Sequence, residues 1–195
     1  MRQQLLPALR MTVLLTVLTG LLYPFAITGL CSILFSKQAH GTLVPGKSEN
    51  GFVGSRLIGQ NFTKPQYFHS RPSAAGDAGY DASSSGGSNL GPTSRKLYDR
   101  LKAAAAQFRK ENPGFTGEIP ADAITTSASG IDPDISVANA EAQAPRVAAA
   151  RQMSLPQVLD VLHAATHDRD LGFLGEARVN VLDANLALDQ GHALK

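Results

Sequence analysis

An uncharged apolar segment sets the strongest limit on how this chain can fold. Residues 11–35 read MTVLLTVLTGLLYPFAITGLCSILF and contain no Asp, Glu, Lys or Arg. At about 1.5 Å per helical residue, the segment exceeds the roughly 30 Å hydrocarbon core of a bilayer. It is too long for the apolar core of a signal peptide, and no small-residue cleavage pattern follows it. The sequence therefore predicts one uncleaved transmembrane helix, followed by a small soluble domain of mixed α/β fold at residues 36–195.

Small and hydroxylated side chains interrupt this apolar segment. Thr12, Thr16 and Thr19 recur at helical spacing and therefore share one face. Small faces let transmembrane helices approach closely, so these threonines are candidate partner contacts, although such residues are also common in simple anchors. Pro24 donates no backbone hydrogen bond, and it predicts a kink in the helix.

Positive charges flank both ends of the segment. Two arginines precede it, and Lys37 and Lys47 follow it, so the positive-inside count is nearly balanced. A short basic tail before the first apolar segment resembles an export signal, and long domains behind such a segment translocate largely regardless of their own charge. We therefore expect residues 1–10 to form a short basic cytoplasmic tail and the soluble domain to lie outside the cytoplasm.

The soluble part is electrically balanced, because it carries 16 of the 18 basic residues and all 16 acidic residues. Nucleic-acid binding needs a basic face that neutralises phosphates, so this balance argues against a nucleic-acid partner. The single cysteine, Cys31, lies inside the apolar segment. One thiol can build neither a disulfide framework nor a thiolate metal cluster.

The soluble part mixes regular patterns with long irregular stretches. Residues 64–94 show neither a helical nor a strand period, and loops beyond roughly fifteen residues are either functional or disordered. The expected regular elements are, in order, a strand within residues 51–62, a helix at about 94–111, a helix after Ser136 that bends or breaks at Pro145, a helix opening at the capping box Ser154-Leu-Pro-Gln157, a strand-like piece at Val179 and Val181, and a final helix.

The most unusual irregular stretch is DASSSGGSNLGPTS, residues 81–94. Gly86 and Gly91 have the spacing of a phosphate-binding G-x-x-x-x-G-K-[ST] loop, but Pro92 stands where that loop needs its lysine. We therefore expect a loop fixed by the domain or by a partner rather than a phosphate cradle. The candidate contacts here, to a partner or to a nucleotide held by a partner, are Ser85, Gly86, Gly87, Ser88, Asn89 and Gly91.

Other groups of polar residues do not assemble into a catalytic or metal site by spacing. His163 and His167 have the i, i+4 spacing of a zinc pair on a helix, but the glutamate of H-E-x-x-H is missing. Asp132 and Asp134 flank Pro133, which favours a turn and the start of a helix. We expect neither catalytic nor metal-binding residues. Candidate partner contacts outside the glycine-rich stretch are Phe68, His69 and Arg71.

Five blocks of the sequence carry a resemblance to a known family. They read GSRLIGQNF, YFHSRPSA, SSGGSNLGPTS, PADAITTSASGIDPDIS and GFLGEARVNVLDANLALD. In this order, behind a basic tail and one apolar helix, they resemble the C subunit of the bacterial Kdp potassium-transporting P-type ATPase over nearly the whole chain. The positions shared with that family map to 59–60, 68–72, 85–92, 127–133 and 172–180.

The resemblance implies a non-catalytic accessory subunit of an ATP-driven, high-affinity potassium uptake pump in the bacterial inner membrane. It implies two partners, a channel-like subunit that conducts potassium and a P-type subunit that hydrolyses ATP. The absence of a D-K-T-G-T phosphorylation motif from this sequence agrees with that division of labour. The family's C subunit is described as a catalytic chaperone that raises the ATP affinity of the hydrolysing subunit, which implies no cofactor of its own but an ATP shared with that subunit.

The expected topology argues against direct contact between the domain and ATP, because ATP is cytoplasmic and the domain is expected to lie outside. A domain that packs on the outer mouth of the potassium-conducting subunit and steadies the complex is therefore favoured over direct contact with ATP. The alternative functions are a membrane-anchored extracytoplasmic binding domain and a hydrolase, each acting alone.

Overall fold

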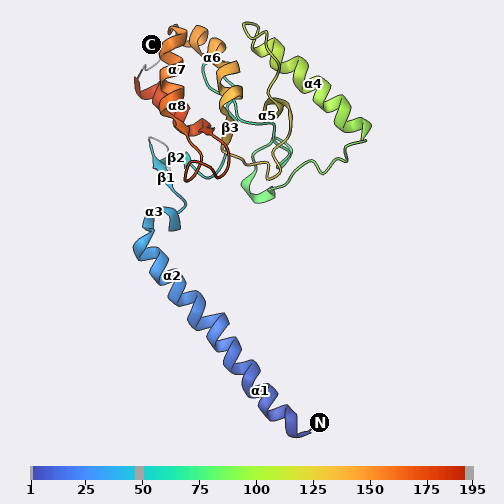
Figure 1. Ribbon diagram of the computed structural model, residues 1–195, viewed down its shortest axis with the longest axis vertical. Coiled ribbons are helices and arrows are strands. Elements are labelled where there is room, and N and C mark those ends of the chain that lie inside the picture. The colour runs from blue at the N-terminus through green and yellow to red at the C-terminus, as the bar shows by residue number, and fades with distance from the viewer. Residues whose placement is uncertain (1, 47–50, 192–195) are drawn as a thin grey trace. The chain divides into compact units, whose positions relative to one another are not determined.

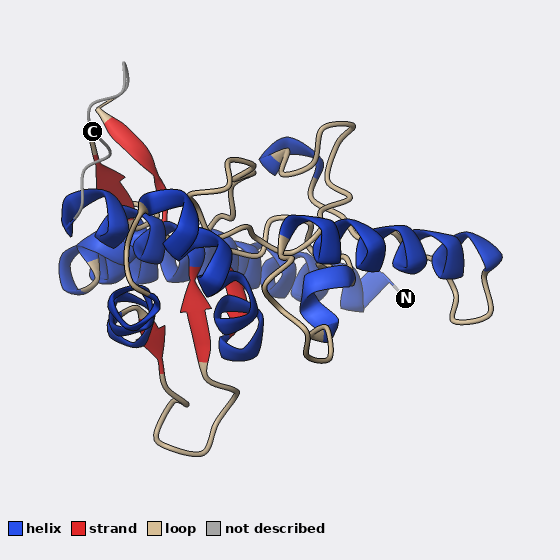
Figure 2. Cartoon of the chain, turned by 90° about the horizontal axis from the view of Figure 1, so that it is seen from above, coloured by secondary structure: helices blue, strands red, loops and turns tan. Residues whose placement is uncertain are grey.

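The computed structural model describes residues 2–46 and 51–191. Lys47, which the topology argument used as a flanking charge, lies outside the described residues. The chain divides into two compact units, Met1–Leu43 and Val44–Lys195. Figure 2 shows that helices dominate the chain and that its strands are short.

The first unit is a long helix followed by one short helical turn (Figure 1). Its consecutive parts are α1 (Arg2–Val17), the π-helix η1 (Leu18–Leu22), α2 (Tyr23–Leu34) and α3 (Ser36–Ala39). The stretch Gln3–Leu34 is 32 residues long, which is long and apolar enough to cross a membrane. The helix thus begins before Met11 and includes most of the expected basic tail.

The π-helical turn lies immediately before Pro24. The Tyr23 N–H donates to the Leu18 carbonyl, which widens the helix by one residue at this point. Such bulges occur where a helix accommodates an interruption of its hydrogen-bond ladder, and Pro24 is one because it lacks an N–H. Where the sequence predicts a kink at Pro24, the structure shows a π-helical turn just before this residue, and the helix continues as α2.

The second unit, the soluble domain, is built around three helices and a small sheet. The helices are α6 (Val137–Arg151), α7 (Leu155–Ala164) and α8 (Val181–Gly191), which Figure 1 shows close together. The sheet is antiparallel with the order β3-β5-β4, formed by Asp134–Ser136, Arg178–Asn180 and Thr166–His167. The core is made of Phe68, Ile135, Ala140, Ala144, Val147, Ala148, Val158, Leu162, Val179, Val181, Ala184 and Leu188.

Local sequence signals explain where these helices begin. Ser136 caps α6 by accepting a hydrogen bond from the Asn139 N–H. Ser154 opens α7, and its N–H donates to Gln157 Oε1 at 2.9 Å, which confirms the expected capping box.

Two local expectations were wrong, and so was the break that was one of the two alternatives at Pro145. Asp134 lies in β3 instead of starting a helix, because Ile135 pairs with Val179 across the sheet. Pro145 lies inside α6 without breaking it, since the burial of the apolar residues around it holds the helix together across the missing hydrogen bond. Val181 begins α8 rather than continuing the strand.

The remaining elements surround an irregular segment, as the sequence predicts. Strand β1 is Leu43–Pro45, and β2 is Phe52–Ser55, which is shorter than the expected strand because a turn follows it. Between residues 56 and 94 the regular structure is the 3-10 turn η2 (Ala82–Ser84). Helix α4 (Arg95–Glu111) confirms the expected helix and lies at the edge of the domain in Figure 1, and α5 is Ala121–Ile124.

Candidate functional site

The segment 65–71 begins in a turn, in which the Tyr67 N–H donates to the Lys64 carbonyl, and continues as irregular chain outside any strand. Buried side-chain amides supply the partners that a neighbouring strand would give to its backbone. The Phe68 N–H donates to Asn185 Oδ1 at 2.8 Å, and the Phe68 carbonyl accepts from Asn185 Nδ2 at 3.0 Å. His69 is held in the same way by Gln143, at 2.7 and 3.0 Å. Buried backbone groups need such partners. The Phe68 side chain is fully buried and belongs to the core.

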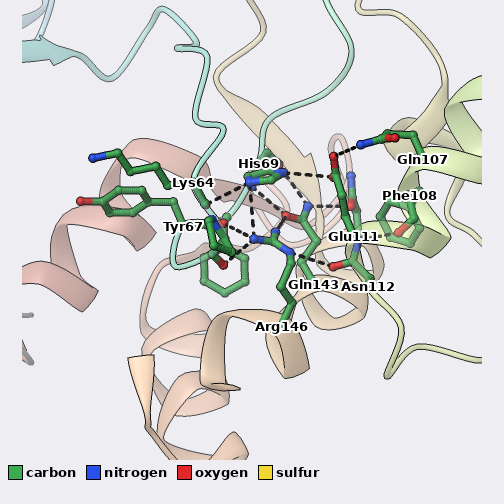
Figure 3. A network of polar contacts seen from close by, with 12 residues as sticks. Lys64, Tyr67, His69, Gln107, Phe108, Glu111, Asn112, Gln143 and Arg146 are labelled. Carbon is green, nitrogen blue, oxygen red and sulfur yellow. Dashed lines mark hydrogen bonds and ion pairs between the residues drawn. The ribbon is translucent and has the colours of Figure 1, made fainter. Parts of the chain in front are cut away.

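Arg146 on α6 joins this segment to the end of α4 (Figure 3). Its Nη1 atom donates to the carbonyls of Pro65 at 2.6 Å and Tyr67 at 2.9 Å. Its Nε atom donates to Asn112 Oδ1 at 3.0 Å, and its Nη2 atom to Gln143 Oε1 at 2.7 Å. Burial lowers the pKa of Arg146 to about 10, which leaves the guanidinium charged at neutral pH.

His69 lies within this network between α4 and α6 (Figure 3). Its Nδ1 atom is 3.4 Å from Glu111 Oε2, and its Nε2 atom is 3.1 Å from the Lys64 carbonyl. Burial and the charge of Arg146 lower the pKa of His69, while Lys64 and Glu111 oppose that shift. The imidazole is therefore mainly neutral at pH 7 and carries one N–H, which donates either from Nε2 to the Lys64 carbonyl or from Nδ1 to Glu111.

This environment predicts an acid-dependent loss of stability. Because the pKa of His69 is lower in the folded domain, the unfolded chain binds the proton more readily, and stability falls as the pH drops below the unfolded pKa of about 6.5. We expect His69→Gln to lose less stability than the wild type between pH 7.5 and pH 5. Urea unfolding of the full chain in detergent, followed by circular dichroism, measures this difference.

The exposed His163 provides the matched control for the loss of an imidazole. His163→Gln should keep the acid-dependent loss of the wild type, because His69 is intact. A His69→Gln profile parallel to that of the wild type would contradict the predicted role of this buried imidazole.

A hollow of about 300 Å³ opens beside the network, with His69, Arg71, Tyr80, Gln107 and Glu111 among the residues that line it. Arg71 forms an ion pair with Asp132 at 3.0 Å, and its carbonyl accepts from the Tyr80 hydroxyl. The structure thus brings His69 and Arg71 to one polar hollow. Both side chains contact other residues of the domain there, His69 the Lys64 carbonyl and Arg71 the carboxylate of Asp132.

The serine- and glycine-rich stretch is braced by the loop 127–130. The Gly86 N–H and the Ser85 hydroxyl both donate to the Ser129 carbonyl, at 2.8 and 2.9 Å. A Cβ atom on Gly87 would lie 3.0 Å from the Ala128 carbonyl oxygen, so any larger residue would press on the backbone of loop 127–130. The domain itself therefore fixes residues 85–87.

The outer part of the same stretch is more accessible. Ser88 is half-buried, whereas Asn89 and Gly91 are exposed, and Asn89 has a left-handed φ of 49°. The inner part is linked to the hollow through Ser73, whose hydroxyl donates to the Gly130 carbonyl at 2.6 Å and accepts from the Tyr80 N–H at 2.9 Å. The structure therefore connects the two groups of candidates within one rigid region.

The remaining candidates lie elsewhere. Thr12, Thr16 and Thr19 lie in the first unit, where all three are exposed, and the Thr19 hydroxyl donates to the Leu15 carbonyl at 2.6 Å. The expected histidine pair does not share a helix, because α7 ends at Ala164 and His167 lies in β4.

Sequence reasoning missed the residues that organise this region, namely Gln143, Arg146 and Asn185. A signal existed for two of them. Asn139, Gln143 and Arg146 recur at helical spacing on an otherwise alanine-rich helix, which is typical of polar residues that contact another part of the chain.

Comparisons with known proteins identify the family. A family model described as K+-transporting ATPase, c chain, matches residues 5–190. A "Potassium-transporting ATPase KdpC subunit" of Myxococcus xanthus is 56% identical over 186 residues, which cover 95% of this chain and 87% of the relative. The protein of the same description from Caulobacter vibrioides is 55% identical over 189 residues, covering 97% and 94%. That from Mycobacterium bovis is 53% identical over 192 residues, covering 97% and 100%. The chain therefore belongs to the c-chain (KdpC) family of potassium-transporting ATPases.

Proposed function

We propose that this chain is the non-catalytic accessory subunit of an ATP-driven, high-affinity potassium uptake pump. One helix anchors it in the bacterial inner membrane with the N-terminus in the cytoplasm. The domain lies outside, where it binds the channel-like potassium-conducting subunit and steadies the complex. The observation that carries this proposal is the match to the family over residues 5–190, together with the apolar helix Gln3–Leu34.

The internal contacts of the domain support a structural role over direct contact with ATP. A phosphate loop needs free backbone N–H groups, and the Gly86 N–H is engaged by the Ser129 carbonyl. Pro92 supplies neither an N–H nor a charge. In this proposal, any rise in the ATP affinity of the hydrolysing subunit is transmitted through the membrane helices, with Thr12, Thr16 and Thr19 as the contact face.

Cysteine accessibility on intact cells tests the topology. Cys31 is first replaced by serine, and single cysteines are introduced at the exposed positions Ala103 and Asp160. Both should react with a membrane-impermeant maleimide, because they lie outside the cell. The matched control, Gln4→Cys, should react only after lysis. Protection of Ala103→Cys and Asp160→Cys on intact cells would contradict the external location.

A second measurement separates the accessory role from the two alternatives. The tagged full chain, expressed with the other pump subunits, should co-purify with the polytopic potassium-conducting subunit. A chain that is recovered alone and still binds a ligand would favour a free-standing binding domain. Hydrolytic turnover by the purified chain would favour a lone hydrolase.

A further inference from the structure

The connection between β4 and β5 forms a turn with an exposed apolar tip. The tip consists of Leu171, Phe173 and Leu174. Their side chains are 82%, 69% and 49% exposed. Scattered apolar residues are normal on a protein surface, but three large ones within four positions form a local patch. Such patches mark sites of interaction.

The tip is rigid. The Asp170 and Leu174 backbones exchange two hydrogen bonds, both of 2.9 Å, and the Gly172 N–H donates to the Arg169 carbonyl at 3.0 Å. Leu171 is a non-glycine residue with a left-handed φ of 54°. That conformation is unfavourable for leucine, and strained backbone of this kind is concentrated at functional sites. The fold thus holds the backbone that carries these apolar side chains in a defined turn, which lowers the entropic cost of binding.

Charges around the tip restrict what can cover it. Asp168, Asp170 and Glu176 are acidic, and Arg169 is the single base between residues 168 and 176. The next base, Arg178, is paired with Asp134 at 3.2 Å. An acidic rim is repelled by anionic phospholipid headgroups, and it is equally repelled by the same rim on a second copy of this chain. It attracts a surface whose apolar pocket is bordered by lysine or arginine.

We propose that this tip inserts into an apolar pocket with a basic border on the outer surface of the potassium-conducting subunit. The inference rests on the proposed function, which places the domain against that subunit. Phe173 is the central anchor, because buried aromatic side chains dominate interface energetics. Asp168 and Glu176 orient the tip against the basic border.

Variants of the full chain test the contact within the assembled pump. We expect Phe173→Ser, alone or with Leu171→Ser, to reduce the potassium-conducting subunit recovered with the tagged chain at least tenfold. The matched control is Leu57→Ser, an apolar residue that is 58% exposed elsewhere on the domain. It should retain the wild-type recovery. Equal thermal unfolding of all the variants by circular dichroism would show that the loss is not a folding defect.

Charge reversal gives an independent measurement. Asp168→Lys combined with Glu176→Lys should lower recovery several-fold, and the ratio of wild-type to variant recovery should shrink as salt is raised. If the charge-reversed variant recovers as much potassium-conducting subunit as the wild type, the pocket on that subunit has no basic border, and this part of the proposal is wrong.

Two outcomes of the recovery experiment distinguish failure of the proposed function from failure of the tip contact, and a fluorescence experiment identifies other occupants of the tip. If the wild-type chain recovers no potassium-conducting subunit, the proposed function fails. If the wild type, Phe173→Ser and the double variant recover it equally, only the tip contact fails. An environment-sensitive dye on Leu171→Cys, in a Cys31→Ser background that keeps the anchor Phe173, should shift to the blue only when the potassium-conducting subunit is present. A shift in nanodiscs of phosphatidylglycerol and phosphatidylethanolamine alone would overturn the proposal in favour of lipid. An intermolecular disulfide between two chains of the unlabelled Leu171→Cys variant, formed under an added oxidant, would overturn it in favour of a second copy.

Discussion

Asn185→Leu is expected to lower the free energy of unfolding of the domain by about 2 to 5 kcal/mol. Leucine nearly preserves the volume of the side chain but can neither accept from the Phe68 N–H nor donate to the Phe68 carbonyl. Both groups lie in the core, since Phe68 is fully buried and Asn185 is 2% exposed. An unsatisfied buried backbone group costs about 1 to 3 kcal/mol, and this substitution leaves two.

Urea unfolding of the full chain in detergent, followed by circular dichroism, measures this loss. Limited proteolysis adds a local readout, because segment 65–71 should become susceptible before the rest of the domain. Asn61→Ala is the control, since this exposed amide makes a single long contact of 3.4 Å to the Ala78 carbonyl. We expect it to change the stability by less than about 0.5 kcal/mol. If Asn185→Leu and Asn61→Ala unfold alike, the two hydrogen bonds between Asn185 and the Phe68 backbone do not hold this segment in place.

Gly130→Ala should destabilise the domain by about 2 to 4 kcal/mol. Gly130 has a φ of +71°, which is unfavourable for alanine. Its Cβ atom would lie 2.7 Å from both the Ala75 Cβ and the Gly86 carbonyl oxygen, so the two braced loops would have to move apart. We therefore expect the Gly86 amide, which donates to the Ser129 carbonyl, to lose protection from hydrogen exchange.

The serine- and glycine-rich stretch supplies its own control for this variant. A Cβ atom on Gly91 would meet nothing within 4 Å, so Gly91→Ala should leave both stability and hydrogen exchange close to those of the wild type. Similar losses in Gly130→Ala and Gly91→Ala would show that the contact between the two loops does not stabilise the domain.

Elements that depend on local sequence were predictable, and elements that depend on distant contacts were not. The helix α4 and the capping box at Ser154 follow from the spacing of apolar residues and from capping chemistry. By contrast, nothing near Asp134 indicates that it lies in a strand, because its partner strand begins more than forty residues later at Arg178. The helix does not break at Pro145 for the same reason, since tertiary packing outweighs a single missing hydrogen bond.

The sequence by itself determined the apolar helix, the family and the irregular character of residues 64–94, because hydropathy, motif order and the lack of a period are properties of consecutive residues. Only the tertiary structure decided how that irregular segment is fixed. Asn185 and Phe68 are 117 positions apart, and Gln143 and His69 are 74 apart. These hydrogen bonds form because α6 and α8 fold onto one core and thereby bring the side-chain amides of Gln143 and Asn185 to backbone groups that have no strand partner. A contact between such distant positions leaves no pattern in consecutive residues, so the sequence alone does not predict it.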